Sequence, residues 1–364
     1  MKIPGVAYRV GGSVRDELMG TEPGKRPAKA RDCDWVVTGA TPKEMQRAGL
    51  KQIGKSFPVY LNPRTGDQYA LARTERKTGR GHQAFEFHFD PDVELIEDLR
   101  RRDLTINAMA RDSDGKLIDP FGGEKDVKDR ILRHVSDAFA EDPLRVFRVA
   151  RFAATLPEFN IAPETREMMR SMQEELADLS AERVWSEYAR AMEGLTPFRF
   201  FDTLSETESI EPWFSGIAVI GLTSIMRERW LRSIDAIAAI GWVHEEATAV
   251  ALFRRLKAPG SVVRLGRDVA RFGHSLSTIL SQDPIDVLSF FERSHAFRPG
   301  TAFQRLVAAV QACAGLDLGC VKRLVGQVSK IRLHGIPSNE YGWHLRQARL
   351  EAIAGFLKES QRDT

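Results

Sequence analysis

The chain has 364 residues, of which 43% are hydrophobic and 28% charged, with a formal net charge of +3. This length allows two or three domains with a substantial core, and the composition is that of an ordinary water-soluble protein. No stretch approaches the roughly 18 apolar residues that span a membrane, and no secretory signal is apparent, so a cytoplasmic protein without a membrane partner is expected. Three cysteines argue against a disulfide framework and a four-ligand zinc site, and the sequence contains no His-Asp dipeptide.

The first third of the sequence alternates between strand and helix patterns. A glycine turn at Gly11-Gly12 separates a short strand from a short helix, and a second helix opens with a capping pattern, Thr41-Pro42-Lys43-Glu44. The predicted elements here are strands at 8–10 and 33–37, helices at 13–19 and 42–48, a hairpin of strands 57–61 and 68–72, and a strand around 85–89.

From about residue 93 the pattern becomes helical, interrupted by a breaker at residues 118–123, and after residue 142 it is almost wholly helical. The sequence therefore predicts an α+β fold, in which a head with a mixed sheet precedes an all-α neck, body and tail. Residues 241–364 carry more Lys and Arg than Asp and Glu, which suits either a polyanionic partner or an ordinary solvated bundle surface.

Asp32 and Asp34 are the first candidate catalytic residues. They are separated by one residue at the start of a predicted strand, and the two-residue period of a strand points both carboxylates to the same face. Paired hard oxygen ligands suit Mg²⁺, which takes the rest of its coordination shell from water and substrate phosphates. On its own, Asp-x-Asp is equally compatible with a decorated turn.

The glycine turn that precedes this pair favours a nucleotide site. Residues 11–16, GGSVRD, form a strand–turn–helix unit whose backbone N–H groups suit a phosphate, and Arg15 adds a charge-assisted contact. A lone Gly-Gly is more often a plain tight turn. Together with the carboxylate pair, it predicts a nucleoside triphosphate and a metal.

A third pattern lies at residues 141–151, EDPLRVFRVAR. Asp142 with Pro143 is a good helix start, in which Asp142 is the N-cap and Pro143 the first helical residue. The arginines Arg145, Arg148 and Arg151 follow at three-residue intervals and share one helix face, where like charges repel unless an anion compensates.

At this point the chain resembles class II tRNA nucleotidyltransferases, the CCA-adding enzymes of the polymerase-β-like superfamily. The resemblance is carried by six blocks in the order of the family, covering roughly the first 155 residues: GGSVRDELMG, DCDWVVTGATPKEM, LARTERKTGRG, RRRDLTINAMA, DPFGG and AEDPLRVFRVARFAA.

The resemblance implies a role for each candidate residue. Asp32 and Asp34 are expected to hold two Mg²⁺ ions for an in-line phosphoryl transfer from CTP or ATP. Gly12, Arg15 and Arg102 are expected to contact the triphosphate, and Asp103 and Asn107 the ribose.

The resemblance also implies how the base is chosen. Asp142 and Arg145 are expected to present acceptor and donor groups to the base edge of C or A, while Arg148 and Arg151 neutralise phosphate or orient the pair. Protein groups would then replace a nucleic-acid template.

The expected domains are a catalytic head at 1–136, a helical neck at 137–210 and a tRNA-binding helical body and tail at 211–364 without an intact His-Asp motif. Residues 75–82 resemble a mobile element needed for the final A, and residues 119–123 resemble a hinge. The partner that the resemblance implies is the acceptor end of tRNA, and a monomer is assumed.

The predicted function is template-independent addition of CCA to the 3′ end of tRNA. Two alternatives remain: a poly(A) polymerase or a partial enzyme that adds only CC or A, and, more remotely, a catalytically silent RNA-binding protein.

Overall fold

The computed structural model describes residues 2–20, 34–53, 59–72, 74–77, 85–88 and 91–360. Its chain forms two compact units. The first comprises Met1–Ala191 and Arg199–Trp213, and the second comprises Met192–Phe198 and Phe214–Thr364. The predicted metal ligand Asp32 lies outside the described residues, as do residues 78–82 of the predicted mobile element.

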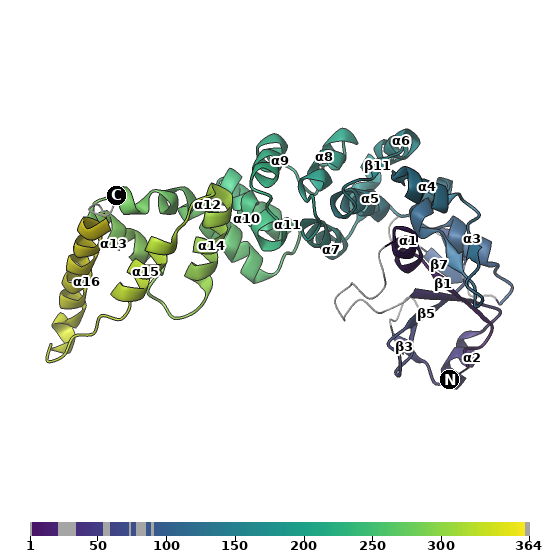
Figure 1. The fold of residues 1–364 in the computed structure, drawn as a ribbon, viewed down its shortest axis with the longest axis horizontal. Helices are drawn as coiled ribbons and strands as arrows, with labels where there is room; N and C mark the ends of the chain where they lie inside the picture. The colour runs from purple at the N-terminus through teal and green to yellow at the C-terminus, as the bar shows by residue number, and fades with distance from the viewer. Residues whose placement is uncertain are drawn as a thin grey trace. The chain divides into compact units, whose positions relative to one another are not determined.

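A seven-stranded mixed sheet forms the head of the first unit (Figure 1). Its strand order is β3-β4-β5-β2-β1-β8-β9, and the β2–β5 pair is parallel while the other pairs are antiparallel. The strands are β1 Val6–Val10, β2 Asp34–Thr38, β3 Lys51–Ile53, β4 Val59–Leu61, β5 Gln68–Leu71, β8 Ala110–Arg111 and β9 Leu117–Ile118.

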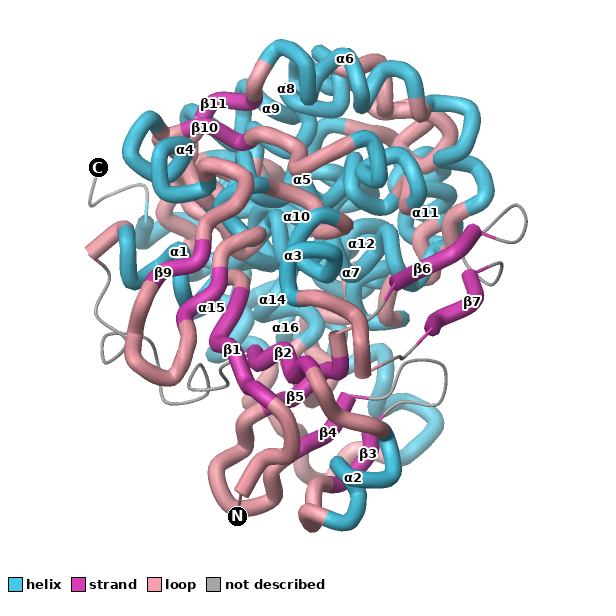
Figure 2. Tube along the Cα trace, turned by 90° about the vertical axis from the view of Figure 1, so that its right-hand side faces the viewer, coloured by secondary structure: helices cyan, strands magenta, loops and turns pink. Residues whose placement is uncertain are grey.

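Two smaller sheets accompany it. The antiparallel pair β6 Thr74–Lys77 and β7 Phe85–His88 forms a separate ribbon, visible beside the sheet in Figure 2. The parallel pair β10 Ile131–Leu132 and β11 Asn160–Ile161 joins the strand before the predicted neck to a strand within it.

The sequence predicted the central strands and missed the short ones. β1, β2, the β4–β5 hairpin and the strand at β7 stand where expected, and buried valines such as Val10, Val36 and Val37 fit a central position in the sheet. The segment after residue 93 was predicted to be helical, and this was wrong for β8 and β9. Two-residue strands are too short to show a period, so tertiary pairing decides them.

Eight described helices lie wholly or almost wholly in the first unit. They are α1 Gly12–Leu18, α2 Pro42–Arg47, α3 Leu95–Arg100, α4 Gly123–Asp129, α5 Leu144–Thr155, α6 Pro163–Ser171, α7 Ala181–Met192 and α8 Phe198–Glu206, with 3-10 turns η2 Thr105–Asn107, η3 Asp137–Glu141 and η4 Gln173–Asp178.

Two helix starts show how the local sequence sets these elements. The predicted capping box of α2 is present, with Thr41 and Glu44 bonded reciprocally. The start of α5 differs from its prediction by one residue: the helix begins at Leu144 and Pro143 is the N-cap. Asp142 still supports this start, because its Oδ1 accepts a hydrogen bond from the Leu144 N–H at 3.1 Å.

The breaker at residues 118–123 connects β9 to the first residue of α4. Both carboxylate oxygens of Asp119 accept backbone N–H groups, from Gly123 at 2.7 Å and Glu124 at 2.9 Å. Gly122 adopts a left-handed φ of 75°, which favours glycine.

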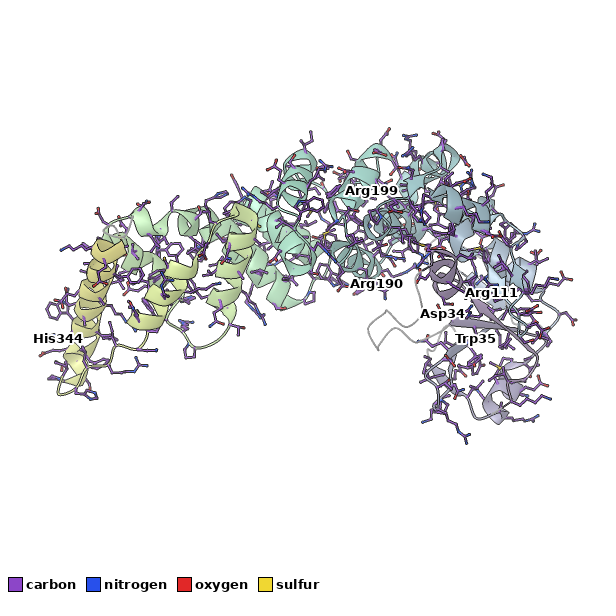
Figure 3. All side chains as sticks on the ribbon, viewed as in Figure 1. Asp34, Trp35, Arg111, Arg190, Arg199 and His344 are labelled. Carbon is purple, nitrogen blue, oxygen red and sulfur yellow. The ribbon has the colours of Figure 1, made fainter. Side chains whose placement is uncertain are left out.

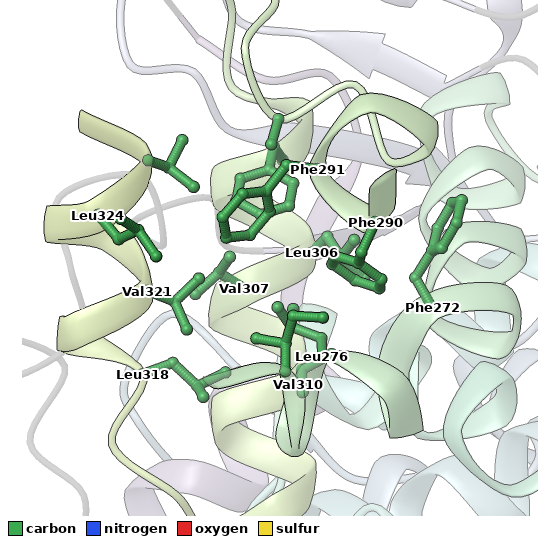
Figure 4. Packing of buried hydrophobic residues seen from close by; sticks show 14 of the residues in the cluster. Phe272, Leu276, Phe290, Phe291, Leu306, Val307, Val310, Leu318, Val321 and Leu324 are labelled. Atoms are coloured by element: carbon green, nitrogen blue, oxygen red, sulfur yellow. The ribbon is translucent and has the colours of Figure 1, made fainter. Parts of the chain in front are cut away.

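The second unit is helical. Its helices are α9 Val219–Glu228, α10 Ser233–Val243, α11 Glu246–Arg255, α12 Gly260–Ser277, α13 Pro284–Arg293, α14 Ala302–Ala314, α15 Gly319–Val328 and α16 Ser338–Ser360, with the 3-10 turn η5 Ile279–Ser281. Its core packs α12 to α15 around Phe272, Phe290, Phe291, Leu306 and Leu324 (Figure 4). None of the helices among the described residues is both long and apolar enough to cross a bilayer.

Candidate active site

A cavity of about 990 Å³ lies within the first unit, between the glycine turn, the edge of β2 and the helices α5 and α7. Its lining is strongly cationic, with eight arginines against four aspartates. The charged lining residues are Arg15, Arg101, Arg102, Arg145, Arg148, Arg151, Arg183, Arg190, Asp34, Asp98, Asp103 and Asp142. Such a lining suits a polyphosphate ligand.

The glycine turn brings two guanidinium groups close to the backbone. Gly11 has a φ of 75° between β1 and α1, a conformation that L side chains rarely adopt. A Cβ on Gly11 would lie 3.3 Å from Nη1 of Arg102, and a Cβ on Gly12 would lie 3.4 Å from Nη2 of Arg15. Both glycines therefore leave room for arginine at the turn.

Arg15 is itself buried, at 8% exposure. Its Nη1 donates to Oδ1 of Asn107 at 2.8 Å, and its Nη2 donates to Oδ1 of Asp16 at 2.7 Å. Burial lowers the pKa of Arg15 to about 10, and the charge of Asp103 opposes that effect. Arg15 thus stays a cation at neutral pH.

Arg102 is held in place by Asp98 and by the backbone. Its Nη2 donates to Oδ2 of Asp98 at 3.3 Å and its Nη1 donates to the carbonyl of Asn107 at 3.2 Å. Asp98 is buried in the first turn of α3, and its Oδ1 also lies 3.8 Å from Nε of Arg101. This carboxylate orients two of the cavity's arginines.

Asp103 links the head to α5. Its Oδ2 accepts from Nε and Nη2 of Arg148 at 2.9 and 2.6 Å, and its Oδ1 accepts from the Leu104 N–H and from Nδ2 of Asn107. Burial alone raises the pKa of Asp103, but the charge and hydrogen bonds of Arg148 outweigh it, so the pKa lies well below its ordinary value. Asp103 is therefore ionised at neutral pH.

The arginine row on α5 is balanced by protein carboxylates. Arg148 pairs with Asp103, Arg151 pairs with Glu187 of α7, and Arg148 also lies 3.8 Å from Glu187. The charge of Asp103 raises the pKa of Arg148, whereas burial lowers the pKa of Arg151. The anion expected to compensate this row is thus supplied at least partly by the protein.

Asp142 and Arg145 lie at the start of α5 and line the cavity together. Oδ2 of Asp142 accepts from Nη2 of Arg183 at 2.7 Å. The guanidinium of Arg145 donates from Nη1 to the carbonyl of Ala138 and from Nη2 to the carbonyl of Arg101. Both side chains are therefore fixed by neighbours while they line the pocket.

Asp34 is exposed at the first position of β2 and lines the same cavity (Figure 3). A carboxylate at this edge, beside a cationic pocket, has the donor chemistry that Mg²⁺ prefers. The structure thus brings Gly12, Arg15, Asp34, Arg102, Asp103, Asn107, Asp142, Arg145, Arg148 and Arg151 around one cavity.

Sequence reasoning missed the contribution of α7. Arg183, Glu187 and Arg190 follow at intervals of four and three residues, which places them on one helix face. This spacing was readable, but nothing in the sequence said that the face was turned toward α5. Asp98 and Arg101 were also missed, because nothing in the sequence showed that they line the cavity.

Comparison with known families gives two matches. Residues 7–133 match the "Poly A polymerase head domain", and residues 158–220 match the "Probable RNA and SrmB- binding site of polymerase A". The first match contains the glycine turn, Asp34 and Asp103, and the second contains α7.

Two relatives match this chain over different shares of their own length. The CCA-adding enzyme of Bordetella pertussis is 40% identical over 97% of this chain and 98% of its own length. The "Multifunctional CCA protein" of Aromatoleum aromaticum is 57% identical over 55% of this chain, and the match spans only 48% of that relative.

Among solved structures, the CCA-adding enzyme of Bacillus stearothermophilus in complex with CTP is similar, with a TM-score of 0.61 and 25% identity. The similarity covers 98% of this chain and 93% of that one. The match to the Bordetella pertussis enzyme over nearly the full length of both proteins shows that the chain belongs to the family of CCA-adding enzymes.

Proposed function

We propose that this protein adds CCA to the 3′ end of tRNA, using CTP and ATP and no nucleic-acid template. One observation carries the proposal: a single cavity contains the glycine turn, Asp34 and the Asp142–Arg145 pair. The first two suit phosphoryl transfer, and the third suits the choice of a base. The full-length similarity to a CCA-adding enzyme supports the same activity.

The triphosphate binds beside the glycine turn in this proposal. Arg15 and Arg102 are cations with fixed positions there, and Gly12 leaves room for the Arg15 guanidinium beside the backbone. Asp34, together with Asp32, holds Mg²⁺ at the adjoining edge of β2. When bound, the metal supplies charge stabilisation and lowers the pKa of the attacking 3′-hydroxyl.

Base choice rests on Asp142 and Arg145. A carboxylate and a planar guanidinium offer an acceptor and paired donors, the groups that a base edge can read. Arg183 fixes the carboxylate, and two backbone carbonyls fix the guanidinium, so the pair is preorganised before the nucleotide arrives.

The ribose lies near Asp103 and Asn107 in this proposal. The amide of Asn107 connects Arg15 to Asp103, so it lies between the triphosphate side and the α5 side of the cavity. A hydrogen bond there to the 2′-hydroxyl favours ribonucleotides over deoxyribonucleotides.

The proposal also covers the domains, two mobile segments, the oligomeric state and the location of the protein. The head is residues 1–136, the neck 137–210, and the helical body and tail at 211–364 bind tRNA through their basic surface. Residues 75–82 and 119–123 are the mobile element and the hinge. The protein acts as a monomer in the cytoplasm.

The test is incorporation of nucleotides into tRNA that ends at the discriminator base. With Mg²⁺, CTP and ATP together, we expect products ending in CCA; CTP alone gives CC. Asp34→Ala should reduce incorporation roughly a thousandfold or more and leave tRNA binding largely intact, because it removes the proposed metal ligand.

Asp67→Ala is the matched control, since Asp67 lies in the β4–β5 turn of the same sheet and is absent from the cavity lining. Long A tails would instead identify a poly(A) polymerase. No extension by the wild-type protein would indicate an RNA-binding protein that has lost its activity.

A further inference from the structure

Arg190 differs from the other arginines of the cavity. The other seven have a charged or backbone partner: Arg15 has Asp16, Arg101 and Arg102 have Asp98, Arg145 has two carbonyls, Arg148 and Arg151 have acidic partners, and Arg183 has Asp142. Among the described residues, none forms a hydrogen bond or ion pair with the guanidinium of Arg190, and the residue is exposed at the cavity.

Its place on α7 separates it from the base-reading pair. Arg190 is seven residues after Arg183, so the two share a helix face and lie about 10 Å apart along the axis. Arg183 holds Asp142, and Arg190 therefore lies two turns away from the groups that would read a base. Figure 3 labels Arg190 near the end of α7 in the first unit.

An exposed arginine in a cationic cavity is electrostatically unfavourable unless an anion compensates it. The proposed reaction brings two phosphate-bearing substrates into the cavity, a nucleoside triphosphate and an RNA strand. The triphosphate side already has Arg15 and Arg102 at the glycine turn. The RNA strand needs a cation elsewhere, and Arg190 belongs to residues 158–220, which match an RNA-binding model.

Building on the proposed function, we infer that Arg190 binds a backbone phosphate of the RNA strand whose 3′ end is extended. It positions the 3′-hydroxyl and takes no part in the choice of base or in holding the triphosphate. Phosphate contacts set register and orientation and do not read sequence.

The test compares Arg190→Ala with wild type by direct binding of tRNA lacking CCA and by steady-state kinetics. We expect the dissociation constant and the KM for tRNA to rise roughly three- to tenfold, between the effects of an exposed ion pair and of a charge-assisted hydrogen bond. The slope of log affinity against log salt should fall by about 0.7 to 0.9, as expected for one phosphate. The KM for CTP and the discrimination against UTP should stay unchanged, and Arg190→Lys should recover part of the affinity.

Arg47→Ala is the matched control, because Arg47 is also an exposed arginine in the last turn of a helix of the first unit and does not line the cavity. If Arg190→Ala behaves like Arg47→Ala, or if it raises the KM for CTP and not that for tRNA, the inference is wrong. RNA binding is measured without turnover, so a wild-type protein that fails to add CCA contradicts the proposed function separately.

Discussion

Asp103 shows how a single carboxylate can organise the site. It is 6% exposed and accepts hydrogen bonds from Arg148, Asn107 and the Leu104 backbone. Its ionised form is stabilised by Arg148, so its pKa is lower in the folded protein than in the unfolded chain. A depressed pKa gives stability that is complete above the unfolded pKa and is lost as the pH falls below it.

We therefore expect Asp103→Asn to lower the free energy of unfolding by about 2–3 kcal/mol at pH 7. This is below the usual cost of breaking a buried pair because the Arg148 side chain is 33% exposed. Urea unfolding of wild type and variant measures the difference.

The pH dependence identifies the cause. The difference should stay constant from pH 8 to 5 and shrink below about pH 4, where the wild-type carboxyl becomes protonated in the unfolded chain. A difference that persists unchanged at pH 3 would show that the lost hydrogen bonds, and not the charge, matter.

At this scale the sequence indicates candidate site residues but not which partners hold them. Asp34, Arg15 and Arg145 could be picked out from local patterns and family blocks. The carbonyls of Ala138 and Arg101 that receive Arg145 could not, because any residue has a backbone carbonyl.

At the scale of elements, the position of α5 depends on its contacts with α7. Arg151 of α5 pairs with Glu187 of α7, and Asp142, just before α5, pairs with Arg183 of α7. Phe147 of α5 also packs against Phe200 of α8. The sequence predicted an almost wholly helical chain after residue 142, with a helix start at Asp142 and Pro143. It did not predict the pairing of α5 with α7, which depends on contacts between residues about 40 positions apart.

We predict that Arg183→Ala weakens nucleotide selection, because Asp142 loses the partner that orients its carboxylate. The ratio of kcat/KM for CTP to that for UTP should fall roughly three- to tenfold, part of the 1–3 kcal/mol that a good base contact contributes. Single-nucleotide incorporation with each triphosphate gives this ratio, and the KM for tRNA should stay near wild type.

Arg166→Ala provides the comparison. Arg166 forms a similar ion pair, with Glu206 at 3.4 Å, but it does not line the cavity. If both variants change the ratio equally, the effect comes from general destabilisation and the positioning role is refuted.

At the scale of the whole molecule, the cavity and the core around Phe291 belong to different units. All residues that line the cavity belong to the first unit, and the second has its own core around Phe291, which is fully buried. The sequence predicted an α+β head followed by helices, but the chain order did not show that Met192–Phe198 belongs to the second unit and Arg199–Trp213 to the first.

Two cores predict two unfolding transitions. Phe291→Ala should lower the stability of the second unit by about 3–5 kcal/mol, the usual cost for a fully buried phenylalanine. Addition of CTP should raise the transition temperature of the first unit only, because ligand binding stabilises the unit that binds. Calorimetry with and without CTP measures both effects.

A single transition that responds to both the substitution and CTP would contradict this division. Phe356→Ala is a milder control, since Phe356 packs against the same core but is only partly buried.

The two carbonyls that hold Arg145 have a consequence for anyone who wishes to redesign the nucleotide preference of this enzyme. The same guanidinium that is proposed to face the base also joins the chain at Ala138 and Arg101 to the first turn of α5. At this position, one side chain therefore serves both the proposed choice of base and the local stability of the fold. A library that varies Arg145 alone would discard useful specificities as unstable proteins, whereas one that also varies the residues around η3 could recover them.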